Sequence, residues 1–94
     1  GSLRIETPGS YRFRLHADDG ARLALDGVVL GEAMTPDQPN QFSVEVALQP
    51  GLHDLRIDYF QRYGGSALQF WWQPPDQPEA PVPPEVLIPK LFYP

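Results

Sequence analysis

The feature that most constrains the fold of this chain is the strict alternation of apolar and polar residues from Tyr11 to Ala17. Positions 11, 13, 15 and 17 are apolar, whereas positions 12, 14 and 16 carry basic side chains. A period of two places successive side chains on opposite faces of a strand, and an apolar face of this kind is buried. The run therefore predicts a strand with one face in a hydrophobic core.

Turn-forming residues follow this strand. The alternation stops at Asp18-Asp19-Gly20, where short carboxylates bond nearby backbone and glycine tolerates positive φ. A second alternating run covers 21–25 and ends at Asp26-Gly27. A type I′ turn needs positive φ at both central residues, which favours this pair. The sequence predicts a hairpin there, with a return strand over 28–30.

Further alternating runs lie at 3–6, 42–48, 54–59 and 66–73, and no run shows a helical period. Short strands at regular intervals with turns between them predict an all-β fold. We expect an antiparallel β-sandwich or barrel of about six to eight short strands. The segment 31–41 contains two prolines and no apolar repeat, so it is predicted to be a long loop of the kind that carries binding residues.

Composition divides the 94 residues into a core and a tail. Eight of the 12 prolines lie from Pro74 onward, so this segment cannot form a central strand. We expect a β-sandwich core over 3–75 and a Pro-rich extended tail over 76–94 that partly wraps it through the apolar residues at 86–88; the alternative is a linker to a neighbouring domain. Gly1-Ser2 is interpreted as the remnant of an expression tag.

Charge and residue content exclude several classes of function. The formal net charge of −5 disfavours nucleic acids and anionic membranes, because both require a basic surface. No apolar run is long enough to insert into a membrane. The chain has no cysteine, and no nucleophile stands beside a base, so we expect a protein that is not an enzyme.

The residues from Tyr11 to Gly27 carry a family resemblance. Their pattern, Y-x-F-x-L-x-A-D-D-G-x-x-L-x-L-D-G, resembles the protective-antigen domain, the PA-fourteen module named after anthrax toxin. Further matches follow in order at 55–61 and 64–68, then at Trp72 and Pro74. The resemblance implies a β-sandwich appended to glycosidases, adhesins, proteases or toxins, in an extracellular, cell-surface or periplasmic setting. The family's full domain has additional strands ahead of Leu3, so this chain is interpreted as a short or N-terminally trimmed version.

The resemblance also implies a candidate calcium site. In the lectin-like branch of the family, two adjacent aspartates joined by a cis peptide ligate one calcium ion, which holds sugar hydroxyls. Asp18 and Asp19 match that pair, and Asn40 matches the asparagine of the neighbouring loop, with Asp37 as a second choice. Calcium prefers six to eight oxygen ligands, so loop carbonyls would complete the set. The alternative is a tight turn in which both aspartates cap backbone amides.

Two aromatic residues are candidates for stacking against sugar rings. Trp71 lies on the strand face opposite Phe70 and Trp72, and Tyr63 lies in a Gly-rich segment. The alternative for Trp71 is burial under the proline tail. His16 and His53 are expected to be solvated residues without a partner. Arg12, Arg14 and Arg22 are expected to pair with acidic neighbours across strands.

Together these features predict a non-catalytic carbohydrate-binding module of a larger extracytoplasmic protein. Calcium assists it if Asp18 and Asp19 form the metal site, and does not if they form the tight turn. Its expected partners are a glycan and the neighbouring domains of a parent chain. The alternative is a structural or protein-interaction domain that spaces or docks a larger partner chain. Deleting the module from its parent separates the two hypotheses, since only the first predicts loss of ligand binding with the parent intact.

Overall fold

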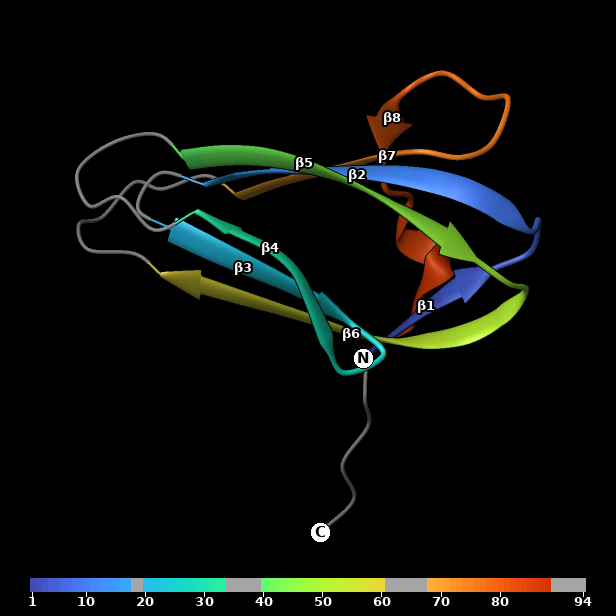
Figure 1. Ribbon diagram of the computed structural model, residues 1–94, viewed down its shortest axis with the longest axis horizontal. Helices are drawn as coiled ribbons and strands as arrows, with labels where there is room; N and C mark the ends of the chain where they lie inside the picture. Colours follow the sequence, from blue (N-terminus) through green and yellow to red (C-terminus); the bar gives the residue numbers. More distant parts are fainter. Residues whose placement is uncertain (18–19, 34–39, 61–67, 89–94) are drawn as a thin grey trace, which may run out of the picture.

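The protein consists of two antiparallel sheets packed face to face (Figure 1). The computed structural model describes residues 1–17, 20–33, 40–60 and 68–88. The strands are β1 (Ser2–Ile5), β2 (Gly9–Ala17), β3 (Gly20–Leu25), β4 (Val28–Ala33), β5 (Asn40–Leu48), β6 (Gly51–Phe60), β7 (Leu68–Gln73), β8 (Ala80–Pro81) and β9 (Leu87–Ile88). One sheet has the order β4-β3-β6-β1-β9 and the other the order β5-β2-β7-β8. The predicted all-β antiparallel sandwich is confirmed.

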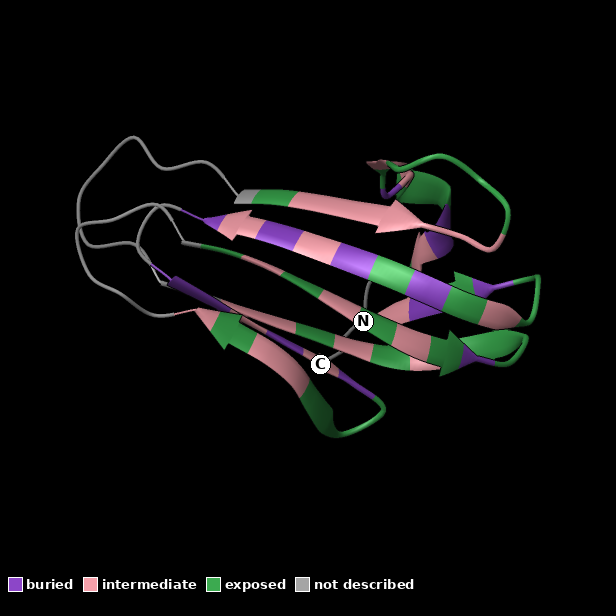
Figure 2. Ribbon diagram, turned by 45° about the horizontal axis from the view of Figure 1, so that its top comes forward, coloured by how far each residue is buried: buried purple, intermediate pink, exposed green. Residues whose placement is uncertain are grey.

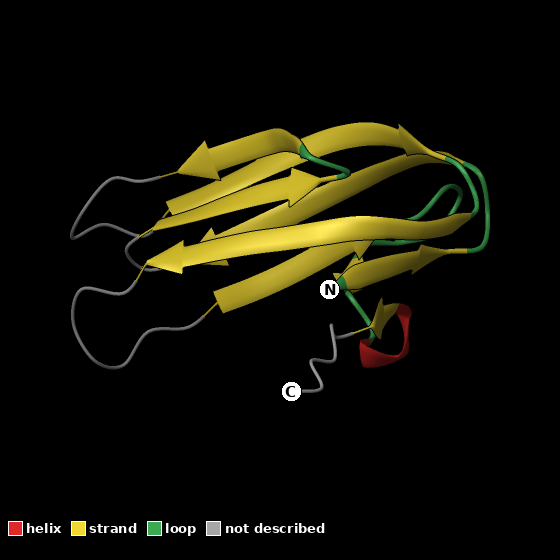
Figure 3. Ribbon diagram, turned by 90° about the horizontal axis from the view of Figure 1, so that it is seen from below, coloured by secondary structure: helices red, strands yellow, loops and turns green. Residues whose placement is uncertain are grey.

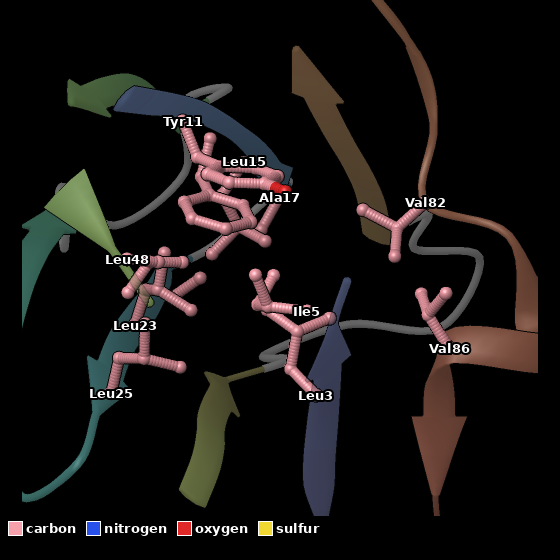
Figure 4. Close-up of a cluster of buried hydrophobic side chains, with 12 residues drawn as sticks. Leu3, Ile5, Tyr11, Leu15, Ala17, Leu23, Leu25, Leu48, Val82 and Val86 are labelled. Carbon is pink, nitrogen blue, oxygen red and sulfur yellow. The ribbon is translucent and has the colours of Figure 1, made fainter. Parts of the chain in front are cut away.

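The core lies between the sheets and follows the alternation of the sequence. Phe13 and Leu15 of β2 face Leu23 of β3 and Leu3 of β1, and all four side chains are fully buried. Figure 2 shows buried and more exposed residues alternating along β2, and Figure 4 shows the buried side chains meeting between the layers. The Tyr11 hydroxyl donates to the carbonyl of Thr7 at 2.6 Å, and burial raises the pKa of this phenol.

The predicted hairpin between β3 and β4 is confirmed. Asp26 has φ 52° and Gly27 has φ 81°, so both central residues of the turn have positive φ. Residues with a Cβ are strained in this region, aspartate and asparagine less than most, and glycine is not, which explains why this pair occupies the turn.

The loop predicted over 31–41 is shorter than expected. Strand β4 continues to Ala33, with Glu32 paired to Arg22, and β5 already begins at Asn40. Strand β4 needs no apolar repeat, because none of its residues is fully buried. Gly31 lies here against β5: a Cβ at this position would come within 2.7 Å of the Phe42 ring. The edges of the two sheets therefore approach closely at this point.

Residues 76–88 of the Pro-rich tail pack on the sandwich, as expected, while residues 89–94 lie outside the described residues. Strand β8 pairs with β7, and β9 pairs with β1, so the tail adds an edge strand to each sheet. A short 3-10 helix, η1 (Pro84–Val86), lies between them. Val82 and Val86 join the core (Figure 4). At the other end of the chain, Ser2 begins β1, and the carbonyl of Gly1 accepts the amide of Leu55 at 2.9 Å.

None of the helices in the described part of the chain is long and apolar enough to cross a membrane.

Candidate functional site

The strand register brings the predicted site segments to one end of the sandwich. Ala17, the last residue of β2, pairs with both Asn40 of β5 and Leu68 of β7. In the other sheet, Gly20 pairs with Phe60, the last residue of β6. The residues that flank 18–19, 34–39 and 61–67 therefore all lie at this one end of the sandwich. We call it the loop end, and Figure 3 shows strands of both sheets ending there.

Most of the residues predicted for the calcium and sugar site lie outside the described residues. These are Asp18, Asp19, Asp37 and Tyr63. Asn40 is described by its backbone, which opens β5, while its side chain is not. Within the described ranges, no group of three or more His, Cys, Asp or Glu side chains could hold a metal ion. The calcium site at Asp18, Asp19 and Asn40 stays a prediction.

Trp71 lies on the outer face of the β5-β2-β7-β8 sheet, as its place in the alternation predicts. The side chain is half-buried, and its cross-strand neighbours are Arg14 of β2 and Pro81 of β8. The Arg14 guanidinium lies over the indole, 5.0 Å from the ring centroid. Glu79 holds this guanidinium, with Oε1 accepting from Nη2 at 2.7 Å and from Nε at 3.1 Å. The tail and Arg14 thus surround the indole, and a ligand could reach only the part that they leave open.

The outer face around Trp71 carries mainly polar side chains from Gln41 to Gln73. The outward residues of the three long strands form three rows, which are Gln41–His16–Gln69, Ser43–Arg14–Trp71 and Glu45–Arg12–Gln73. The last row borders a depression of about 410 Å³, lined by Ser10, Arg12, Glu45, Gln73, Pro74, Pro75 and Asp76. The sequence motifs did not single out this depression; the signal was the outward alternation of β2, β5 and β7.

The three arginines of the sequence prediction have different surroundings. Arg22 pairs across strands with Glu32 at 2.9 Å, which confirms the prediction for this residue. Arg14 finds its carboxylate in the tail rather than on a neighbouring strand. Arg12 faces Glu45 across β5, but Glu45 accepts the Ser10 hydroxyl at 2.8 Å, and Arg12 makes no ion pair or hydrogen bond with any described residue. The predicted pairing of Arg12 is therefore wrong within this part of the chain.

His53 has partners that the sequence did not reveal, so its expected role as a solvated residue without a partner is wrong. Its Nδ1 lies 2.6 Å from Asp26 Oδ2, and its Nε2 lies 2.7 Å from the carbonyl of Gln49. The hydrogen bond that His53 donates to the Asp26 carboxylate raises the pKa of His53, and the same bond lowers the pKa of Asp26. The cluster lies at the β3–β4 turn, at the opposite end of β3 from the loop end, so it belongs to the scaffold.

Comparisons with known proteins agree with this architecture. The model of one protein family, the PA14 domain, matches residues 1–85. The anti-sigma-I factor RsgI3 of Acetivibrio thermocellus is 27% identical over 90 residues, which are 95% of this chain and 14% of that protein.

Two solved structures have the same fold. A chain described as an anti-sigma factor domain-containing protein superposes with a TM-score of 0.88 at 24% identity. A second one, from Clostridium clariflavum, superposes with a TM-score of 0.77 at 22% identity. Each superposition covers 98% of this chain and 32% of the solved chain. The chain therefore spans about a third of the length of the solved structures and a smaller share, 14%, of the length of RsgI3. Since the PA14 model matches most of the chain, as the motif from Tyr11 to Gly27 predicted, this protein belongs to the PA14 domain family.

Proposed function

We propose that this chain is a non-catalytic carbohydrate-binding module of a larger extracytoplasmic protein, and that calcium assists binding at the loop end. The observation that carries the proposal is the pairing of Ala17 with Asn40. Ala17 directly precedes Asp18, and Cα atoms paired across antiparallel strands lie about 5 Å apart. The two chain segments with the predicted calcium ligands therefore start side by side.

The chemistry of the proposed site follows from its donor set. Asp18 and Asp19 would supply carboxylate oxygens and Asn40 an amide oxygen, all of which are hard ligands that calcium prefers. A calcium ion held by few protein ligands keeps free positions, and vicinal sugar hydroxyls can take them. Tyr63 and the open part of Trp71 would add flat apolar surface for a sugar ring. A glycan needs no reactive group here, so the proposed role is recognition.

The relatives support a role within a longer chain. RsgI3 and both solved structures are much longer than this module, and their names describe anti-sigma factors. We therefore propose neighbouring domains of a parent protein as the second class of partner. In such a parent the module would supply the binding of an extracellular ligand.

Calcium titration of chelator-treated protein, followed by heteronuclear NMR, tests the metal site. The amides of Gly20, Ala17 and Asn40 should shift together and saturate. The double variant Asp18→Asn/Asp19→Asn should lose these shifts, whereas Asp58→Asn, on the outer face of the other sheet, should keep them. Unchanged spectra at millimolar calcium would remove calcium from the proposal.

A glycan array with and without chelator tests the binding function itself. We expect at least one class of oligosaccharide to bind, with higher affinity in calcium. Absence of binding to every glycan under both conditions would overturn the proposal.

One observation favours a second function, as an interaction domain. An apolar depression of about 430 Å³ lies beside β6 and the tail, lined by Gly1, Ser2, Leu55, Ile57, Pro84, Leu87 and Ile88. Apolar surface of this kind suits contact with a neighbouring domain. Deletion of the module from a parent chain distinguishes the two functions: an interaction domain predicts that assembly of the parent fails while glycan binding is unaffected.

A further inference from the structure

We propose that the outer face of the β5-β2-β7 sheet is a second, calcium-independent binding surface that takes several consecutive sugar units of one polysaccharide chain. We call this surface the polar track. It extends from the loop end to the depression at Pro74–Asp76. The inference deepens the proposed function, because it names an extended glycan as the ligand and assigns residues that contact it.

The register places the polar track in direct continuation of the loop end. The pairs of β2 and β7 that face outward follow one another from that end in the order His16–Gln69, Arg14–Trp71 and Arg12–Gln73. The row of His16 lies next to the Ala17–Asn40 pair. From His16 to Arg12 the strand covers about 13 Å, since each residue advances by about 3.3 Å. This length exceeds one sugar ring, so a ligand that covers it is a chain of sugars.

The side chains of the polar track match the chemistry of sugar hydroxyls, which both donate and accept hydrogen bonds. Gln69 and Gln73 offer an amide donor and a carbonyl acceptor each. Arg12 offers a planar set of donors that no described residue uses. Glu45 uses one oxygen, Oε1, to accept from Ser10. Planar groups with two adjacent polar atoms can bond two neighbouring hydroxyls at once.

The outer face of the other sheet lacks this property. Its three arginines are each paired with a carboxylate: Arg4 with Glu6 at 3.7 Å, Arg22 with Glu32 at 2.9 Å and Arg56 with Asp58 at 3.0 Å. Exposed apolar side chains, Val29 and Leu52, also lie there. Within the described parts of both sheets, the β5-β2-β7 face therefore has hydrogen-bonding side chains without a protein partner on both sides of a half-buried indole. The outer face of the other sheet does not.

The polar track is also held in place at its middle row and at the end near Pro75. Arg14 is held between Trp71 and Glu79, so the middle row is already ordered. At the far end, Pro75 packs against Gly9, where an added Cβ would come within 2.7 Å of the proline ring. A surface that is already ordered loses little conformational entropy when a ligand binds, which favours affinity.

The test measures how affinity depends on the length of the glycan. Gluco-, xylo- and manno-oligosaccharides from disaccharide to hexasaccharide are titrated into the protein by calorimetry, in the presence of chelator. We expect the affinity of at least one series to increase with length. Arg12→Ala should weaken hexasaccharide binding about tenfold, because a hydrogen bond from a charged group is lost. Gln73→Ala should weaken it about fivefold.

A matched control is Arg4→Ala, which removes an exposed arginine from the other outer face and should leave the affinity unchanged. Melting temperatures of all variants show that they are folded. The polar track would be overturned if affinity does not change with glycan length or in the Arg12→Ala and Gln73→Ala variants. If calcium-dependent binding persists in that case, the proposed function still stands. Absence of binding by every glycan, with and without calcium, would overturn both.

Discussion

The contacts of His53 favour its charged form in the folded protein. Both ring nitrogens face acceptors, because Nδ1 meets the carboxylate of Asp26 and Nε2 meets the carbonyl of Gln49. Only the imidazolium has two N–H donors, so the charged form satisfies both contacts and the neutral form loses one. The same geometry explains the raised pKa of His53 and the lowered pKa of Asp26.

The stability of the protein should therefore depend on pH through this pair. The raised pKa of His53 gives a contribution that is complete below the ordinary histidine value of 6.5 and is lost as pH rises through the folded-state pKa. The lowered pKa of Asp26 gives a contribution that is present above 3.8 and is lost as pH falls through its folded-state pKa. Urea denaturation should show a plateau between these values and a decrease of under about 1 kcal/mol on the alkaline side, because the carboxylate is half-exposed.

The variant Asp26→Asn provides the control, because asparagine also tolerates the positive φ of this turn. It removes the charge and should reduce the difference in unfolding free energy between about pH 5 and about pH 8. The NMR titration of His53 should move toward its ordinary pKa in the same variant. If wild type and variant have the same pH dependence, the pair does not contribute as described.

At the scale of the strands, the approach of β4 to β5 should depend on Gly31. An alanine there would place its Cβ 2.7 Å from two atoms of the Phe42 ring and 3.0 Å from Val44 Cγ1. The ring must move or the strands must separate, so Gly31→Ala should lower the free energy of unfolding by about 1–3 kcal/mol. The double variant Gly31→Ala/Phe42→Leu should recover part of this loss, which a double-mutant cycle measures. Equal stability of Gly31→Ala and wild type would show that the two edges do not close on one another.

The tail should stabilise the sandwich through its buried valines. Val86 is 9% exposed and packs with the core, whereas Ile88, two residues later, is 37% exposed. Val86→Ala should cost about 1–3 kcal/mol through lost burial and a small cavity. Ile88→Ala is the matched control and should cost clearly less. Thermal unfolding followed by circular dichroism gives both values, and the reverse order would contradict the packing of the tail.

The strands could be predicted from the sequence where one face is buried and the other is exposed to solvent. The alternation of β2 and the Asp26-Gly27 turn follow from local rules that act within a few residues. The extension of β4 to Ala33 was missed because an edge strand carries no such pattern. The carboxylate partners of His53 and Arg14 were missed for a different reason. Asp26 and Glu79 lie 27 and 65 residues away from them in sequence, and only the folded sheets bring them together.

The candidate site could be predicted only in part. The family resemblance predicts Asp18, Asp19 and Asn40 as ligands, and the register of β2 with β5 explains how the segments that carry them come to one end. The polar track could not be predicted from a motif, because its residues belong to three strands and become neighbours through pairing alone. Its distinguishing property, an arginine without a carboxylate partner among the described residues, depends on where Glu45 and Glu79 direct their oxygens.

For the molecule as a whole, one loop end joins both sheets, so a ligand bound there stabilises the entire sandwich. The strands β2, β3, β5, β6 and β7 all have an end at this place. A small domain unfolds cooperatively, and a ligand that binds only the folded state raises its free energy of unfolding. Calcium binding at Asp18 and Asp19 should therefore be visible in global unfolding.

Calcium at a hundred times its dissociation constant should raise the free energy of unfolding by about 2.7 kcal/mol. For a domain of this size that corresponds to an increase in melting temperature of about 10 °C or more. Scanning calorimetry in calcium and in chelator measures it, with magnesium as a control for ionic strength. Asp18→Asn/Asp19→Asn should abolish the increase, yet melt in chelator at or above the wild-type temperature, because two adjacent carboxylates repel each other when no cation is bound. Identical melting of the wild type in calcium and in chelator would mean that the aspartate pair is a turn, and that sugar binding by this domain must depend on the polar track alone.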